Sequence, residues 1–269
     1  MCISWLKDIF SKPVNPETGT TVVDEPVTAN TETNEPENNN TMTENNDNNP
    51  ISGGDVIIVP AQKVNFHVLL DNGHASSTPG KRMQMVNGKW FFEYEFNRDV
   101  VRRIAEKLDK LGIPYEILVP EVDTDVALSA RAARANEFCN RYGAGNCFFI
   151  SVHSNAFGDG KSFNSARGWS IWTTKGSTKS DNYATIMYNV ANEILPKYCM
   201  TTRAQWDDGD PDYEENFTVI YKTNCPAVLT ENMFFTNEVE VNWLMTAEGR
   251  DVIADIHVEA IKRIIDSRK

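Results

Sequence analysis

Hydrophobic positions downstream of residue 63 follow two alternating spacings. The 3.6-residue period of amphipathic helices covers 91–111, 125–142 and 181–198, and further helices fill the C-terminus. Short apolar runs typical of strands cover 64–70, 115–119, 147–152, 168–173, 217–221 and 226–230. Strands that alternate with helices predict a three-layer αβα domain around a largely parallel or mixed twisted sheet of about six strands.

The chain upstream of this pattern has a different composition. Residues 13–62 are rich in Asn, Thr, Glu and Pro and poor in large apolar side chains, which predicts a disordered linker before a folded domain at 63–269. Within 1–12, Ile3, Leu6, Ile9 and Phe10 would share one face of a short amphipathic helix. That segment fits a weak membrane or partner contact and equally a chain end with no fixed structure.

Charge and cysteine content argue against several classes of protein. Residues 1–63 hold 10 acidic and 3 basic side chains, so they carry -7 of the net charge of -12. No basic stripe is present, which argues against a nucleic-acid partner. The five cysteines show no CxxC spacing and are odd in number, which argues against a disulfide framework and a thiolate metal site. No secretory signal or membrane span is recognised, so synthesis in the cytoplasm is expected.

Three predicted strands deliver a polar residue at or just beyond their ends. His74 follows the strand at 64–70, His153 follows that at 147–152, and Glu231 follows that at 226–230. The carboxyl ends of neighbouring parallel strands meet at one edge of a sheet, where ligand sites gather. The three side chains are therefore expected to converge.

Helical phase adds a fourth residue. With Glu93 at 0° and steps of about 100°, the apolar Val100, Ile104 and Leu108 share its side of the helix, whereas Glu95 falls with Arg98 on the solvent side. A carboxylate on a buried face is costly unless something positive pairs with it, and a metal ion would do so. Two histidines and one glutamate form a common catalytic zinc set.

Four sequence blocks occur in one order across nearly the whole folded domain. They are 71–74 (DNGH), 93–97 (EYEFN), 151–156 (SVHSNA) and 226–237 (PAVLTENMFFTN). This set resembles the zinc-dependent N-acetylmuramoyl-L-alanine amidases of the AmiC/CwlV type, including phage endolysins. The resemblance implies that His74, Glu93 and His153 hold one zinc ion and that Glu231 is the catalytic acid and base.

The resemblance also implies supporting residues. Arg131 and Asn136 match an Arg and an Asn five apart in the family's second helix, and they are expected to support the site without taking part in chemistry. Asp71 is expected to orient His74 from behind the ligand. The acidic, aromatic loop 205–216 would either line a substrate groove or form ordinary surface.

The activity implied by the resemblance is peptidoglycan hydrolysis at the amide between the lactyl group of N-acetylmuramic acid and L-alanine. One alternative is a zinc carboxypeptidase, but those enzymes place a glutamate three residues after the first histidine, where this chain has Ser77. A second alternative is an inactive module that binds peptidoglycan. A monomer that reaches the cell wall by phage-type lysis, or by another release that needs no secretion signal, is the expected setting.

Overall fold

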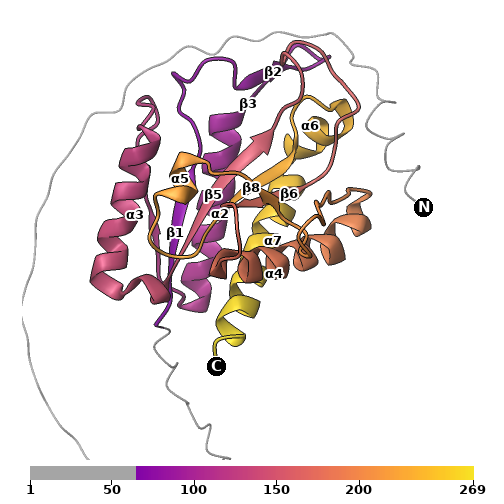
Figure 1. Ribbon diagram of the computed structural model, residues 1–269. Coiled ribbons are helices and arrows are strands. Elements are labelled where there is room, and N and C mark those ends of the chain that lie inside the picture. The colour runs from indigo at the N-terminus through magenta and orange to yellow at the C-terminus, as the bar shows by residue number, and fades with distance from the viewer. Residues whose placement is uncertain (1–64) are drawn as a thin grey trace, which may run out of the picture. The chain divides into compact units, whose positions relative to one another are not determined.

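A six-stranded mixed sheet runs through the middle of residues 65–269, the part of the chain that this computed structural model describes (Figure 1). Its strands are β1 (His67–Asn72), β4 (Tyr115–Ile117), β5 (Cys147–Asn155), β6 (Ser170–Thr173), β7 (Tyr213–Glu214) and β8 (Ala227–Phe234). They lie in the order β4-β1-β5-β8-β6-β7, and β4, β1, β5 and β8 are parallel. β6 is antiparallel to β8 and parallel to β7. The predicted segments 1–12 and 13–62 lie outside the described residues.

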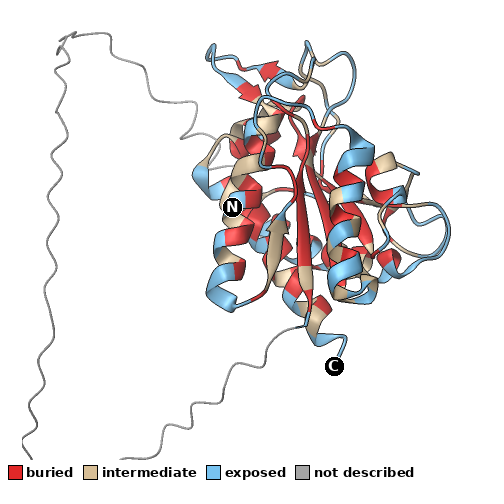
Figure 2. Ribbon diagram, turned by 90° about the vertical axis from the view of Figure 1, so that its left-hand side faces the viewer, coloured by how far each residue is buried: buried red, intermediate tan, exposed pale blue. Residues whose placement is uncertain are grey.

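Helices cover both faces of the sheet, as Figure 2 shows from the side. One face carries α2 (Glu93–Leu111), α4 (Lys179–Ile194) and α7 (Ala247–Asp266), and the other carries α3 (Leu128–Tyr142) and α5 (Thr218–Tyr221). The short α6 (Glu238–Leu244) follows β8. The predicted three-layer αβα fold is therefore confirmed. No helix between residues 65 and 269 has both the length and the apolar composition needed to cross a bilayer.

The sequence of β5 is a nearly continuous apolar run because the strand is buried on both faces. Phe148 and Ile150 point into the core formed with α2, α4 and α7, whereas Cys147 and Phe149 point into the core formed with α3 and α5. A strand covered by helices on both faces needs apolar side chains at consecutive positions. Each fully buried Phe or Ile contributes about 1.5–3 kcal/mol to folding.

Two local predictions are wrong. Residues 217–221 form the single helical turn α5 and no strand, closed by the bond from Tyr221 N to Phe217 O at 2.9 Å. The run favours a strand by composition, but the adjacent Val219 and Ile220 are both buried in the core formed with α3, which a turn allows and an alternating strand does not. Tertiary packing therefore overrides local propensity.

The start of the first long helix also differs from the prediction. Phe91 and Phe92 belong to β3 (Trp90–Phe92), which forms a two-stranded sheet with β2 (Arg82–Gln84), and α2 begins at Glu93. Three-residue strands are too short for their alternation to be recognised. β5 and β8 also run further than predicted, to Asn155 and Phe234, so His153 and Glu231 lie inside strands.

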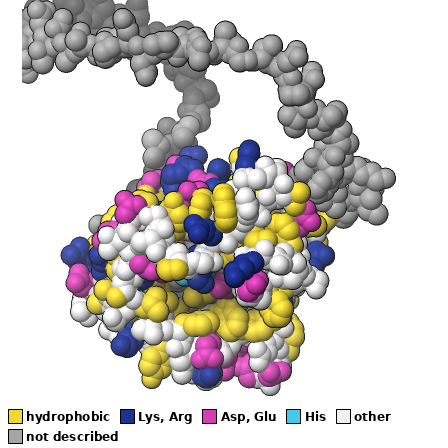
Figure 3. All heavy atoms as spheres, turned by 90° about the horizontal axis from the view of Figure 1, so that it is seen from above, with side chains coloured by type: hydrophobic (Ala, Val, Ile, Leu, Met, Phe, Trp, Pro, Cys, Tyr) yellow, Lys and Arg dark blue, Asp and Glu magenta, His cyan; other side chains and the backbone are white. Residues whose placement is uncertain are grey.

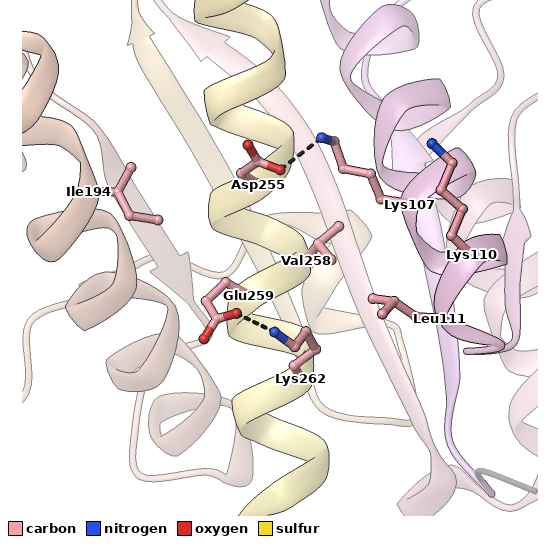
Figure 4. A pocket seen from close by; sticks show the side chains of 8 residues that line it. All are labelled: Lys107, Lys110, Leu111, Ile194, Asp255, Val258, Glu259 and Lys262. Atoms are coloured by element: carbon pink, nitrogen blue, oxygen red, sulfur yellow. Dashed lines mark hydrogen bonds and ion pairs between the residues drawn. The ribbon is translucent and has the colours of Figure 1, made fainter. Parts of the chain in front are cut away.

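A surface groove of about 530 Å³ lies among α2, α4 and α7 (Figure 4). Ion pairs between Lys107 and Asp255 at 2.8 Å and between Lys262 and Glu259 at 2.6 Å line it. It lies at the C-terminal end of α2, and at 1.5 Å per residue that end is roughly 27 Å from Glu93. The groove is therefore separate from the polar cluster described next.

Candidate active site

The turn after β1 holds His74 in an unusual backbone conformation. Its φ of 64° is in the left-handed region, which costs a residue with a side chain about 1–2 kcal/mol. Asn97 Nδ2 donates to Gly73 O at 3.0 Å, and Arg98 Nη1 donates to His74 O at 2.9 Å. The first turns of α2 thus fix the backbone that carries His74.

The glycine before this histidine makes room for the second one. A Cβ atom at Gly73 would lie only 2.0 Å from Cε1 of His153, so the imidazole of His153 fills the space that a side chain would need. The two histidine rings are nearly perpendicular, at 87°, with centroids 4.8 Å apart. Neighbouring parallel strands and one glycine therefore bring the two imidazoles together.

Glu93 lies between these rings at the first position of α2. Its side chain is 1% exposed, and its Oε1 is 3.3 Å from His74 Nε2 and 3.1 Å from His153 Nδ1. The Ser154 amide donates to the same Oε1 at 3.2 Å, while Oε2 is buried and has no hydrogen-bond partner in the described chain. Glu95 is exposed, so the helical phase argument is confirmed for the placement of both glutamates.

The ionisation of Glu93 and His74 suits a metal-binding group. Burial raises the pKa of Glu93, but hydrogen bonds to His153 and His74 outweigh it and hold this pKa well below its usual range. Burial lowers the pKa of His74, and this effect exceeds the opposing hydrogen bond to Glu93. The pKa of His153 is instead raised, because its bond to Glu93 and that carboxylate's charge outweigh burial. An anionic carboxylate between two imidazoles results.

These three residues offer one ligand atom each, all within 4.8 Å of one another. Neutral imidazole nitrogens and a carboxylate oxygen are ordinary ligands of a catalytic metal, and such a site leaves one position open. The unpartnered Oε2 of Glu93 is a buried acceptor that a cation would satisfy. The group of His74, Glu93 and His153 therefore has the composition and burial of a metal site.

Glu231 lies beside this group on the adjacent strand. It is in register with His153 across the parallel β5 and β8 pair, so both side chains project from the same face of the sheet. Burial raises the pKa of Glu231 to about 7, with a further contribution from the charge of Glu93 and an opposing one from His153. Its Oε2 is buried and has no hydrogen-bond partner within residues 65–269. Such a carboxyl can exchange a proton near neutral pH.

Asp71 and Arg131 stabilise the turn from behind. Arg131 Nη1 donates to Asp71 Oδ1 at 2.9 Å and to Asn72 O at 3.1 Å, and Ser151 Oγ donates to Asp71 Oδ2 at 2.6 Å. No hydrogen bond joins Asp71 to the His74 imidazole within residues 65–269, and the expected orientation of that ring by Asp71 stays a prediction. Asp71 ties β1 to β5 and α3 below the histidines.

Asn136 lies elsewhere. Its Nδ2 donates to Lys222 O at 2.8 Å, and its side-chain oxygen accepts from Asn224 N at 2.8 Å, so it fastens the loop between α5 and β8. Arg131 therefore reaches the turn that carries His74, whereas Asn136 supports the approach to the strand that carries Glu231. The expected supporting role of Asn136 in catalysis stays a prediction.

Sequence reasoning missed the role of Arg98, which was expected on the solvent side of the helix. The side chain is half-buried and donates to His74 O, Tyr94 O and Glu121 O. A long arginine can leave its helical face and carry its charged end several ångströms away. Helical phase places the Cα atom correctly but does not determine where such a side chain ends.

Two cavities lie near this edge of the sheet, and both histidines line the first of them. The first, of about 300 Å³, lies on the β1 side, and its lining includes Asp71, His74, Asp125, Arg131 and His153. The second, of about 530 Å³, lies toward β6, and its lining includes Asn155, Phe157, Arg167, Trp172, Arg203 and Phe234. Figure 3, which views the molecule from above, shows histidine in a hollow bordered by basic and hydrophobic side chains.

The acidic loop 205–216 lies next to the larger cavity, and its expected part in a substrate groove stays a prediction. Tyr213 lies in β7, and its ring stacks on Trp172 with centroids 4.7 Å apart, next to the larger cavity. Trp206 is exposed. Asp212 is buried and accepts a hydrogen bond from Thr173 Oγ1. One end of the loop therefore abuts the cavity and its tip is ordinary surface.

Asp212 gives a testable pH dependence of stability. Burial and the neighbouring Asp210 raise the pKa of Asp212 to about 8 in the folded chain. This pKa exceeds that of Asp212 in the unfolded chain, so the protonated carboxyl stabilises the folded state. That stabilisation is fully present below about pH 4 and is lost as the pH rises through about 8. Asp212→Asn removes this titration. Between about pH 4 and 8, the free energy of unfolding of the variant is expected to rise relative to that of wild type by about 1 kcal/mol per pH unit.

Thermal melts between pH 4 and 9 measure this difference. Asp208→Asn is the matched control, since Asp208 is exposed in the same loop and its replacement removes the same charge. If the melting curves of Asp212→Asn and wild type shift in parallel with pH, Asp212 does not titrate as described.

Comparison with known proteins agrees with this geometry. The chain is 28% identical over 206 residues to the endolysin of Bacillus phage SPP1, which covers 75% of this chain and 67% of the endolysin. The crystal structure of N-acetylmuramoyl-L-alanine amidase from Clostridium difficile 630 matches with a TM-score of 0.61 and 24% identity, covering 76% of this chain and 98% of that one.

The catalytic domain of CwlV, an N-acetylmuramoyl-L-alanine amidase from Bacillus (Paenibacillus) polymyxa, matches with a TM-score of 0.59 and 21% identity, covering 75% of this chain and 98% of that one. These two structural likenesses establish the fold. The family model described as N-acetylmuramoyl-L-alanine amidase matches residues 68–263, a region that includes both histidines and both glutamates of the site. The resemblance seen in the four sequence blocks is therefore confirmed, and the chain belongs to the N-acetylmuramoyl-L-alanine amidase family.

Proposed function

We propose that this protein hydrolyses the amide between the lactyl group of N-acetylmuramic acid and L-alanine of the peptide stem, with one zinc ion held by His74, Glu93 and His153. The observation that carries the proposal is the buried Glu93 between two imidazoles, next to Glu231 with its raised pKa. Family membership supports peptidoglycan amidase activity. The metal and the residue roles are the proposed part.

Zinc is the ion that this ligand set fits best. Two histidines and one glutamate leave a fourth position for water, and the donor types are those found in catalytic zinc sites. When bound, zinc supplies Lewis acidity that polarises the amide carbonyl and lowers the pKa of water toward about 7.

Glu231 is assigned the proton transfers. Its Oε2 accepts the proton of the attacking water, because a pKa of about 7 lets the carboxyl gain and lose a proton at neutral pH. The same oxygen then donates that proton to the nitrogen of L-alanine, which leaves as an amine. Glu231 is not one of the proposed ligands, so it stays free to change its protonation state.

The remaining residues of the site hold positions. Arg131, Asp71 and Ser151 tie the ends of β1 and β5 together, and Arg98 fixes the carbonyl of His74. Catalytic side chains held by such contacts keep the geometry that the reaction needs. The proposed catalytic group therefore stands on two strands, the turn after β1 and the first turn of α2, and these contacts hold it in place.

The two alternatives account less well for the structure. In this chain the clustered glutamate comes from the start of α2, and Ser77, three residues after His74, is exposed, which disfavours the carboxypeptidase pattern. An inactive module has no need for a complete His, Glu, His and Glu set at one sheet edge. The amidase assignment explains all four side chains.

Defined muropeptides, incubated with the zinc-loaded protein and analysed by mass spectrometry, test the proposal. An amidase releases the intact stem peptide with a free N-terminal L-alanine and leaves the glycan without peptide. Cleavage inside the stem would point to a peptidase instead, and intact muropeptides retained on the protein would point to a binding module.

The setting that we propose is lysis of the bacterial cell wall. The relative from phage SPP1 carries the name endolysin. The substrate partner is accordingly peptidoglycan, and a monomer is expected to suffice because every proposed catalytic residue comes from one chain.

A further inference from the structure

Arg203 is an unmatched cation beside the proposed catalytic residues. Its guanidinium carbon is 5.1 Å from the ring centroids of both Tyr213 and Phe234, at the larger of the two cavities. Within residues 65–269, no carboxylate forms an ion pair with it and no side-chain hydrogen bond uses its donors. The other arginine of this cavity, Arg167, lies 4.0 Å from Glu240 and donates to Cys199 O at 3.4 Å.

Contact with aromatic rings leaves the edges of a guanidinium available. A planar arginine over a ring uses its face, and its five N–H donors lie in its plane. Those donors match the two oxygens of a carboxylate in a bidentate pair. The Tyr213 and Phe234 rings thus restrain Arg203, while no side chain or carbonyl within residues 65–269 accepts a hydrogen bond from its guanidinium.

The backbone next to Arg203 makes room for its side chain. A Cβ atom at Gly168 would lie 2.9 Å from Arg203 Cγ, and Gly168 has a φ of 106°, which other residues rarely adopt. Arg203 N also donates to Trp169 O at 2.8 Å. The space at Gly168 and the backbone hydrogen bond to Trp169 therefore fix the position of Arg203 next to the start of β6.

Strand pairing places Arg203 at a defined distance from Glu231. Glu231 pairs with Ser170 of β6, and the adjacent Trp169 pairs with Thr202, the neighbour of Arg203. Two strand spacings of about 4.8 Å put the two backbones roughly 10 Å apart.

A peptide stem that leaves the proposed scissile amide toward β6 would reach Arg203 with its second residue. Each extended residue spans about 3.5 Å, so the second residue lies roughly 7 Å from the scissile carbonyl. That residue is a D-glutamate linked through its γ-carboxyl, which leaves its α-carboxyl either free or amidated. The free form is the first stem anion beyond the cleaved bond.

We propose that Arg203 forms a subsite for the α-carboxylate of the second stem residue, so that the enzyme favours stems in which this group is not amidated. The inference rests on the proposed amidase function and adds a substrate preference to it. Arg203 acts here in binding, and the proton transfers stay with Glu231.

The test compares two substrates that differ only at this group, N-acetylmuramoyl-L-alanyl-D-glutamate and its α-amide, N-acetylmuramoyl-L-alanyl-D-isoglutamine. With the full zinc-loaded chain, kcat/KM is expected to be roughly ten- to a hundredfold higher for the free carboxylate, since a hydrogen-bonded charge pair is lost with the amide. The preference should appear in KM more than in kcat, because the pair forms on binding.

Arg203→Gln should bring the two kcat/KM values close together by lowering the value for the carboxylate substrate, and Arg203→Lys should keep part of the preference. Arg167→Gln is the matched control, since it removes the same charge from the same cavity at a residue already paired with Glu240. This control should keep the wild-type preference.

The outcomes separate this inference from the function on which it rests. Equal cleavage of both substrates by wild type overturns the Arg203 subsite and leaves the amidase function standing. If the enzyme cleaves neither of these substrates nor intact peptidoglycan, both the Arg203 subsite and the amidase function are overturned. If Arg167→Gln removes the preference as fully as Arg203→Gln, general electrostatics explains it and the subsite assignment is wrong.

Discussion

Glu231→Gln is expected to lower kcat by a factor of about 10²–10⁴ while the zinc content stays at the wild-type level. Gln has nearly the same shape but cannot accept a proton as a carboxylate does. Because Glu231 is assigned to proton transfer and not to metal binding, the ion should be retained. Substrate binding keeps its contacts, so KM should change far less than kcat.

The zinc content of the purified variant and its steady-state kinetics on muropeptides measure these effects. Glu95→Gln, at an exposed glutamate, provides the control and should be near wild type in both. Loss of zinc from Glu231→Gln would make Glu231 a ligand. Near-normal turnover with full zinc would mean that another group carries the proton.

Glu93→Ala is expected to abolish both zinc binding and activity. Without the carboxylate only two imidazoles remain, and a two-ligand site cannot hold the ion in competition with water. The variant also loses the stabilisation from bound metal, which is about 4 kcal/mol when free zinc exceeds the dissociation constant a thousandfold. For a domain of this size the melting temperature in zinc should fall by about 10 °C.

Glu95→Ala is the matched control for this prediction, since it lies two positions further along the same helix and faces solvent. It should keep its zinc and its melting temperature. A chelator should bring wild type down toward Glu93→Ala and leave that variant unchanged. The opposite pattern, in which Glu95→Ala loses zinc and Glu93→Ala keeps it, would refute the ligand assignment.

Hydrophobic patterning predicted the parts of the fold that local physics controls. The strands that carry His153 and Glu231 are buried on both faces and therefore read as continuous apolar runs. Glu93 was found because the buried side of a helix leaves a fixed angular pattern. Those regularities depend on neighbours in sequence, so they can be read without a structure.

Contacts between distant segments were beyond that analysis. The antiparallel direction of β6, the turn at 218–221 and the bond from Arg98 to His74 depend on packing between segments far apart in the chain. The pairing of Asp71 with Ser151 joins residues 80 positions apart, and nothing in either local sequence indicates it. Arg203 was missed because its significance lies in the lack of an ionic partner within residues 65–269, which no local sequence pattern indicates.

The close approach of the His153 ring to Gly73 limits how this chain can change by mutation. The ring occupies the position of a missing β-carbon, so even alanine at residue 73 would overlap it. A larger residue there would need a smaller one at residue 153, and that exchange removes an imidazole from the cluster. In a library of single variants, position 73 should therefore be as intolerant as the histidines themselves, although glycine contributes no functional group. The geometry therefore prevents substitution at position 73 alone, so positions 73 and 153 constrain each other.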